Sequence, residues 1–548
     1  MRQGRDWRKS KPRCICWNGT KNQQSFIPNL TLPLFLATCI RNPYFAFLKT
    51  DFFKIGALKL PIRETTKAFL RLMPFLAVLL LAFAMTSPVW YDDSDHWGVS
   101  KHLAKTGEMA YLLDSESGKA DPFSQFITCG PVFHYPGSWV MKIFGTDMKI
   151  ARMISVAWAL CFAFIFYLLA NFLTNLKKAN WAILIVFLNI QFLTYGSQYI
   201  AEIPMVLFLL SGFLMIARSL KEDNSNDWFA WISGGFFFGL AMLVKEYALV
   251  PVFPSLAILA LFLWIKKENG FGPIVAGMVA GIVLLGGYFF RFGSIENIQA
   301  FLEARKVYST EFFSFGWEYS LPFILLKPLI PLGTIAIFLK IRVRKNRADS
   351  WAGIFQLSLI AFYFLSAGFD RFGMLLIFIP AIYLSEFIVL IWEKWVTSRT
   401  ENGKKIFRFS VFAIGFLALF SQQTFPVLVW RMLHVERVNE AEKCIANSLV
   451  DFPSIKIFTC EEQIISFLPE RVFYRLPKTV PWAKKENENV FPRQDEWFLE
   501  GPYSRTEYFV KLNLSEGKWE KVLECGSGDN QLRLWRPVSE MDYVASMN

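Results

Sequence analysis

Uninterrupted apolar runs, long enough to cross a lipid bilayer, constrain this chain of 548 residues more than any other feature. FLRLMPFLAVLLLAFAM (69–85) and FGPIVAGMVAGIVLLGGYFF (271–290) are two of them. A helix of about 20 apolar residues spans a hydrocarbon core roughly 30 Å thick. Hydrophobic residues make up 54% of the chain and charged residues only 19%, a balance that soluble domains do not show. The sequence therefore predicts an all-α polytopic transmembrane bundle.

The net charge of +13 does not indicate a nucleic-acid-binding protein, because the basic residues are concentrated in short connections between apolar runs. Examples are KK (266–267) and RVRKNR (342–347). Lysine and arginine gather in this way in cytoplasmic loops. Lys67 and Arg71 precede the first run, so its N-terminal end is predicted to be cytoplasmic and Asp92 to emerge outside.

The number of spans depends on GPVFHYPGSWVMKIFG (130–145), which is apolar but short and contains two prolines. If this segment spans the membrane, some basic loops fall outside. If it lies along the surface or re-enters, every basic loop falls inside, which we prefer. We expect about 11–13 spans in total. The other predicted spans are 69–85, 150–174, 179–197, 202–219, 228–245, 247–265, 271–290, 321–341, 352–369, 373–392 and 409–430.

Three regions follow from these patterns. Residues 1–66 are predicted to be a basic, disordered N-terminal extension, and residues 67–430 the transmembrane region with a large outer loop at 91–149. Residues 431–548 are polar and alternate short helical and strand-like segments, which predicts a small extracytoplasmic α/β domain. Cys444, Cys460 and Cys525 lie in it, and two of them can pair in an oxidising compartment.

The outer loop begins with DDSDHWGVSKHLAKTG (92–107), a group of carboxylates directly after the first span. Charged groups close to a bilayer are costly and therefore call for a pairing or functional reason. An acidic surface loop without a function is the simpler alternative. A carboxylate that removes a proton from an attacking hydroxyl is the functional one.

This segment resembles the first extracytoplasmic loop of the GT-C glycosyltransferases. It is most similar to the branch of the dolichyl-phosphate-mannose–protein mannosyltransferases and bacterial aminoarabinose transferases. Asp92 and Asp93 stand at the acidic pair of that loop and Gly107 at its glycine. Five later segments resemble family blocks in the same order: 130–145, 151–173, 195–213 with Glu202 at an acidic position, 239–249 with Lys245 at a lysine, and 369–384 with Arg371 at an arginine. The chain departs from the aminoarabinose branch at Gly130, where that branch has a lysine.

The resemblance implies transfer of a single sugar from a polyprenyl-phosphate donor to a lipid, protein or glycan acceptor. Asp92 is our candidate for the general base, with Asp93 and Glu202 as alternatives or as residues that orient it. The phosphate that leaves needs cations around it. The candidate substrate-binding residues are Lys101, His134, Tyr135, Lys245, Arg305 and Arg371. No cofactor is certain; a divalent metal ion held by Asp92 and Glu202 is one possibility that the sequence leaves open.

Two other functions remain open from the sequence. A transporter or lipid flippase also needs charges near the membrane, although such proteins commonly show internal repeats and helices broken at the bilayer midplane. We find no half-to-half repeat, and the acidic residues gather at one face. A non-catalytic assembly subunit leaves Asp92 and Glu202 unexplained. We expect an enzyme of the bacterial inner membrane, with its active site on the extracytoplasmic face and membrane lipid around it.

Overall fold

The computed structural model describes a large part of the chain after residue 61. The described residues are 62–89, 91–124, 127, 129–221, 227–312, 320–321, 323–324, 327, 329–344, 346–366, 370–397, 429, 433, 439–452, 454–469, 471–476, 492–493, 495–502, 519–528 and 531–538. The predicted N-terminal extension, apart from its last five residues, and the predicted span 409–430, apart from residue 429, lie outside them.

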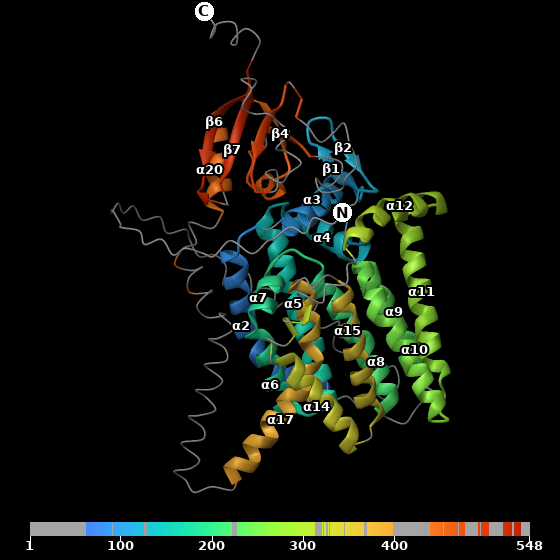
Figure 1. Ribbon diagram of the computed structural model, residues 1–548. Helices are drawn as coiled ribbons and strands as arrows, with labels where there is room; N and C mark the ends of the chain where they lie inside the picture. The colour runs from blue at the N-terminus through green and yellow to red at the C-terminus, as the bar shows by residue number, and fades with distance from the viewer. Residues whose placement is uncertain are drawn as a thin grey trace, which may run out of the picture. The chain divides into compact units, whose positions relative to one another are not determined.

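Apolar helices form the larger part of the described chain (Figure 1). Within the described residues, six helices are long and apolar enough to cross a membrane, or seven if one bent pair counts as a span. This confirms the polytopic helical fold. The helices are α2 (Ile62–Thr86), α5 (Met148–Leu173), α6 (Leu176–Phe187), α7 (Ile190–Ser197), α8 (Glu202–Lys221), α9 (Trp228–Val244), α10 (Leu249–Ile265), α11 (Phe271–Phe292), α12 (Ile295–Phe312), α14 (Leu329–Arg344), α15 (Arg347–Leu365), α16 (Asp370–Gly373) and α17 (Phe378–Thr397), with short 3₁₀ turns η2 (Glu246–Ala248) and η3 (Met374–Leu376).

The bent pair is α6 and α7, which meet at an angle of 71°. Asn189 begins α7: its side-chain oxygen accepts hydrogen bonds from the backbone N–H groups of Gln191 and Phe192. Such a cap satisfies N–H groups that a new helix leaves without intrahelical partners. The predicted single span 179–197 is therefore two helices with a cap between them.

Charged side chains separate to the two ends of the bundle. At one end, Glu386 of α17 accepts from Lys178 of α6 at 2.9 Å and from Arg344 of α14 at 2.9 Å. At this end Asn171 of α5 also bonds Thr65 near the start of α2. Helices α2 and α5 are antiparallel, so the end of α2 and the start of α5 lie at the other end of the bundle, next to the acidic loop.

Two helices of the outer loop, α3 (Tyr91–Thr106) and α4 (Pro131–Phe144), pack against each other beside the bundle (Figure 1). The 14 residues of α4 give a length of about 21 Å at 1.5 Å per residue, too short for a bilayer core. This agrees with the preferred sequence interpretation, in which segment 130–145 does not cross the membrane.

A mixed sheet of seven strands joins the outer loop to the C-terminal region, in the order β2-β1-β4-β3-β5-β7-β6. The hairpin β1–β2 comes from the outer loop, and β1 pairs antiparallel with β4 at Asp114 and Arg475. A two-stranded hairpin is at best marginally stable alone, so this edge gives it support. The predicted C-terminal domain 431–548 thus shares its sheet with residues 111–121. The strands are β1 (Tyr111–Asp114), β2 (Lys119–Asp121), β3 (Ile455–Thr459), β4 (Val472–Arg475), β5 (Trp497–Glu500), β6 (Trp519–Cys525) and β7 (Leu532–Pro537).

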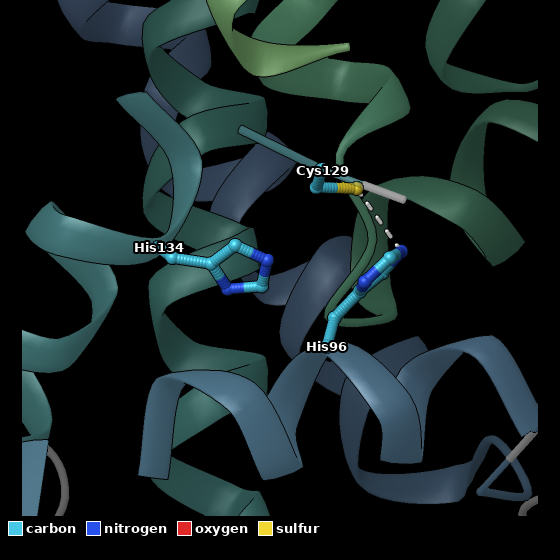
Figure 2. Close-up of side chains that lie close together, drawn as sticks. All are labelled: His96, Cys129 and His134. Atoms are coloured by element: carbon cyan, nitrogen blue, oxygen red, sulfur yellow. Dashed lines mark hydrogen bonds between the residues drawn. The ribbon is translucent and has the colours of Figure 1, made fainter. Parts of the chain in front are cut away.

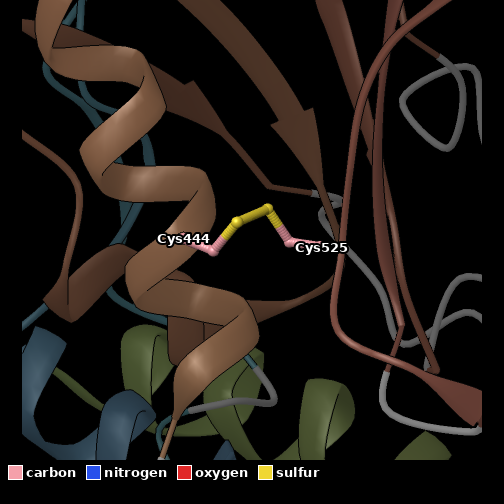
Figure 3. The surroundings of a disulfide bond; sticks show 2 residues. All are labelled: Cys444 and Cys525. Carbon is pink, nitrogen blue, oxygen red and sulfur yellow. A yellow bond between two sulfur atoms is a disulfide. The ribbon is translucent and has the colours of Figure 1, made fainter. Parts of the chain in front are cut away.

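The C-terminal part carries the helix α20 (Glu440–Ser448) and the 3₁₀ turns η5 (Leu449–Asp451) and η6 (Glu462–Ser466). Cys444 of α20 and Cys525 at the end of β6 form a disulfide (Figure 3). Apolar side chains from α20 and the strands, including Ile445, Ile457 and Leu534, pack beneath it. The alternation of short helical and strand-like segments predicted for this region is seen in α20, β3 and the β6–β7 pair.

Candidate active site

Four charged side chains, each in a different helix or directly after one, meet where the outer loop begins. Asp92 lies in the first turn of α3, Glu202 begins α8, Lys245 follows α9 and Arg371 lies in α16. Arg371 donates to Asp92, and its Nε lies 3.5 Å from Glu202 Oε1. Lys245 Nζ lies 2.6 Å from the same oxygen of Glu202. We call these four residues the ion network.

Burial divides the ion network into an inner and an outer part. The side chains of Glu202 and Lys245 are 0% and 2% exposed, whereas that of Asp92 is 41% exposed and that of Arg371 15%. A buried charge is tolerated only when it is paired and hydrogen-bonded. The buried charges of Glu202 and Lys245 therefore balance each other. Asp92 is the carboxylate of the network that an incoming molecule can reach.

Asp93 faces a different partner from its neighbour Asp92. Its carboxylate is fully buried, accepts from Arg152 Nη2 at 2.7 Å and from the backbone N–H of Tyr199 at 2.7 Å. Arg152 also donates to three backbone carbonyls at the end of the first span, those of Ala84, Ser87 and Pro88. These hydrogen bonds of Arg152 connect α5, the end of α2 and the start of α3. Both carboxylate oxygens of Asp93 are already hydrogen-bonded within the protein.

His96 lies one turn along α3 from Asp92, and its side chain is close to those of Cys129 and His134. All three are residue types that can bind a metal ion, and we call them the His–Cys trio (Figure 2). All three are buried, and His96 Nε2 lies 3.3 Å from Cys129 Sγ. Burial, aided by the charge of Lys245, lowers the pKa of His96 to about 4. Burial also holds the pKa of His134 well below its usual value, so both imidazoles are neutral at neutral pH.

The other predicted substrate-binding residues lie outside the ion network. Lys101 Nζ sits 4.3 Å above the ring of Trp97 on the same helix. Arg305 of α12 pairs with Glu246 at 3.3 Å, next in sequence to Lys245. The ring of Tyr135 packs against the ring of Phe290. His134 bonds Ser100 and belongs to the His–Cys trio.

The sequence left open a divalent metal ion held by Asp92 and Glu202. In the structure Arg371 contacts both carboxylates, so a cation of the chain itself balances them. The sequence did not single out Cys129, Ser100 or Tyr199. One signal was available: Asp92, His96 and Ser100 are spaced by four residues, which places them on one face of α3.

The loop helix α3, the ends of α8 and α9 and the short helix α16 thus bring one ion network together. The helical bundle with its attached sheet is a fold of the GT-C type. A family model described as dolichyl-phosphate-mannose-protein mannosyltransferase matches residues 128–286. This match and the similar folds of solved structures confirm the GT-C resemblance recognised in the sequence.

The solved structures that have a similar fold include these two. ArnT from Cupriavidus metallidurans, bound to undecaprenyl phosphate, superposes with a TM-score of 0.58 at 12% identity, over 85% of this chain and 97% of that one. The archaeal oligosaccharyltransferase AglB from Archaeoglobus fulgidus, in complex with an inhibitory peptide and a dolichol-phosphate, gives a TM-score of 0.52 at 12% identity, over 87% and 76%. A comparison with curated proteins gave no match.

Proposed function

We propose that the protein transfers a single sugar from a polyprenyl-phosphate donor to a hydroxyl group of a lipid, protein or glycan, with Asp92 as general base. The observation that carries this proposal is the ion network, in which Asp92 is exposed and Glu202 is enclosed by cations. The two similar structures hold undecaprenyl phosphate and dolichol-phosphate, which supports a lipid phosphate as the donor's carrier.

In the proposed reaction, the acceptor oxygen attacks the anomeric carbon while its proton passes to Asp92. The bond between that carbon and the phosphate oxygen breaks, and the lipid phosphate leaves with the electron pair. Arg371 is the cation that we assign to this phosphate, because it is partly exposed and adjoins Asp92. Stabilisation of the growing negative charge by a fixed cation is commonly a large part of catalysis.

Glu202 and Lys245 are assigned a positioning role. Glu202 lies within 3.5 Å of Arg371 Nε and is itself held by Lys245. We assign the same kind of role to Asp93, whose carboxylate holds Arg152 at the junction of α2, α3 and α5. These buried pairs fix the direction of the side chains that meet the substrate.

We place this site on the extracytoplasmic face of a bacterial inner membrane. The basic side chains of Lys178, Lys340 and Arg344 gather at the opposite end of the bundle, as basic residues do at cytoplasmic ends. The Cys444–Cys525 disulfide in the part of the chain next to the outer loop also fits an oxidising compartment.

The test compares envelope lipids, proteins and glycans by mass spectrometry in cells that lack the protein. We expect these cells to lose one sugar from one class of molecule, and wild-type protein to restore it. Asp92→Asn should restore at least about 100-fold less at equal expression, the usual contribution of a general base. Glu108→Gln, which changes an exposed carboxylate just after the same helix, is the control. Full restoration by Asp92→Asn, or an unchanged sugar content without the protein, contradicts the proposal.

A further inference from the structure

We infer that His96, Cys129 and His134 form a zinc site beside the ion network. One ligating atom from each residue lies within 4.8 Å of those of the other two, and all three residues are buried. Figure 2 shows the side chains converging from α3, from α4 and from the segment before α4. The inference concerns metal binding alone and does not rest on the proposed transfer reaction.

The hydrogen bonds around His134 orient it as a ligand. Its Nδ1 lies 2.8 Å from Ser100 Oγ, and Ser100 Oγ lies 2.9 Å from the hydroxyl of Tyr199. Its Nε2 is buried and has no hydrogen-bond partner among the described residues. Metal-binding histidines characteristically use one ring nitrogen for an outer hydrogen bond, which fixes the ring and leaves the other nitrogen for the metal.

The backbone holds Cys129 in place through its neighbour Gly130. The N–H of Gly130 donates to the carbonyl of Val244 at 2.9 Å, at the end of α9. A Cβ at Gly130 would lie 1.9 Å from the carbonyl oxygen of Leu243, so the chain here runs directly against α9. The thiol is thus presented by a fixed segment, a form of preorganisation that metal sites require.

The donor set indicates the ion. Two imidazole nitrogens and one thiolate suit Zn²⁺, which takes four ligands in tetrahedral geometry. Three protein ligands leave a fourth position for water or another small ligand, as in zinc sites that are not closed. Binding releases the thiol proton. Because His96 comes one turn after Asp92, the ion would also hold the start of α3 against α4 and add positive charge near the ion network.

The experiment uses the full-length protein in detergent. The protein is stripped with a chelator, loaded with Zn²⁺, desalted, and its metal content measured by mass spectrometry. We expect one zinc per chain in the wild type and none in Cys129→Ser or His134→Gln. Ser100→Ala keeps all three ligands and should weaken zinc binding about 10- to 100-fold, as the loss of an outer-shell partner does. Cys161→Ser and His102→Gln are the matched controls and should bind zinc as the wild type does.

A second measurement does not depend on the folding of any variant. Wild-type protein loaded with Co²⁺ should show a thiolate-to-cobalt charge-transfer band, which a chelator removes and Zn²⁺ displaces. A wild type that retains no zinc and shows no such band overturns the inference. Zinc content in Cys129→Ser equal to that of the wild type, with the cobalt spectrum unchanged, overturns it as well.

Discussion

Lys245 Nζ lies 2.6 Å from Glu202 Oε1, and the two side chains are almost completely buried. The pair connects the end of α9 to the start of α8, and Glu202 passes the connection on to Arg371 at 3.5 Å. Arg371 in turn reaches Asp92 on α3. The exposed carboxylate is therefore held at the end of a chain of charges that alternate in sign. The predictions below test this chain and the packing around it.

Glu202→Gln should destabilise the protein strongly, because it leaves the ammonium group of Lys245 buried without its carboxylate. Loss of one partner of a buried pair costs about 3–5 kcal/mol. Thermal unfolding of the purified protein in detergent measures the effect. The control is Glu393→Gln, which removes a pair of similar length, 2.8 Å to Lys177, but in an exposed position, and it should change the midpoint little. Equal midpoints for the two variants contradict the assigned role.

Arg152→Lys keeps the charge and should still destabilise the junction of α2, α3 and α5. The guanidinium of Arg152 serves Asp93 and three backbone carbonyls at once, and a lysine ammonium cannot reproduce that planar fork. We expect a loss of about 2 kcal/mol or more in the free energy of unfolding. Arg342→Lys, at an exposed position on α14, should leave the unfolding midpoint unchanged. A tolerated Arg152→Lys shows that charge alone is enough at this junction.

Gly130→Ala should disturb the segment that leads into α4, because the new methyl group meets the carbonyl oxygen of Leu243. Overpacking of this kind typically costs about 1–3 kcal/mol. Gly281→Ala places a methyl group on α11 where no described atom lies within 4 Å, and it should be neutral. Unfolding midpoints of the two variants provide the comparison. A Gly130→Ala variant as stable as the wild type contradicts the steric argument.

The Cys444–Cys525 disulfide should stabilise the C-terminal sheet, since it joins residues separated by 81 positions in sequence. For a loop of this length, the chain-entropy model gives about 4 kcal/mol. The Cys444→Ala, Cys525→Ala double variant should become sensitive to protease in this region, whereas Cys460→Ala, which removes a cysteine outside the disulfide, should not. Equal protease resistance of the double variant and the wild type contradicts the stabilising role.

The same cysteines report the side of the membrane. In intact cells, a reductant followed by a membrane-impermeant thiol reagent should label Cys444 and Cys525 if this region is extracytoplasmic. Before reduction, we expect these two cysteines of the wild-type protein to remain unlabelled. Labelling only after the membrane is opened places the region, and the active site beside it, on the cytoplasmic side.

Local patterns in the sequence predicted much of the fold. The apolar runs predicted α2, α5, α8, α10, α11 and α15 because hydropathy is a property of neighbouring residues. The alternation of short helical and strand-like segments predicted the mixed character of the C-terminal part. Of the candidate site, Asp92, Glu202, Lys245 and Arg371 were all named from their blocks. The structure brings these four together.

Other relationships needed the tertiary structure. Asp92 and Asp93 are adjacent and chemically identical, yet one is exposed and the other is enclosed by Arg152, because successive residues of a helix point in directions about 100° apart. The hairpin 111–121 pairs with β4 through Asp114 and Arg475, which lie 361 positions apart in the sequence. The thiol of Cys129 met two histidines from α3 and α4. By itself the sequence determined a helical membrane protein and the residue types of its site. Packing between distant segments decided which of those residues pair, which stay exposed and which can share a metal ion. Such contacts depend on long-range geometry, which local sequence patterns do not encode.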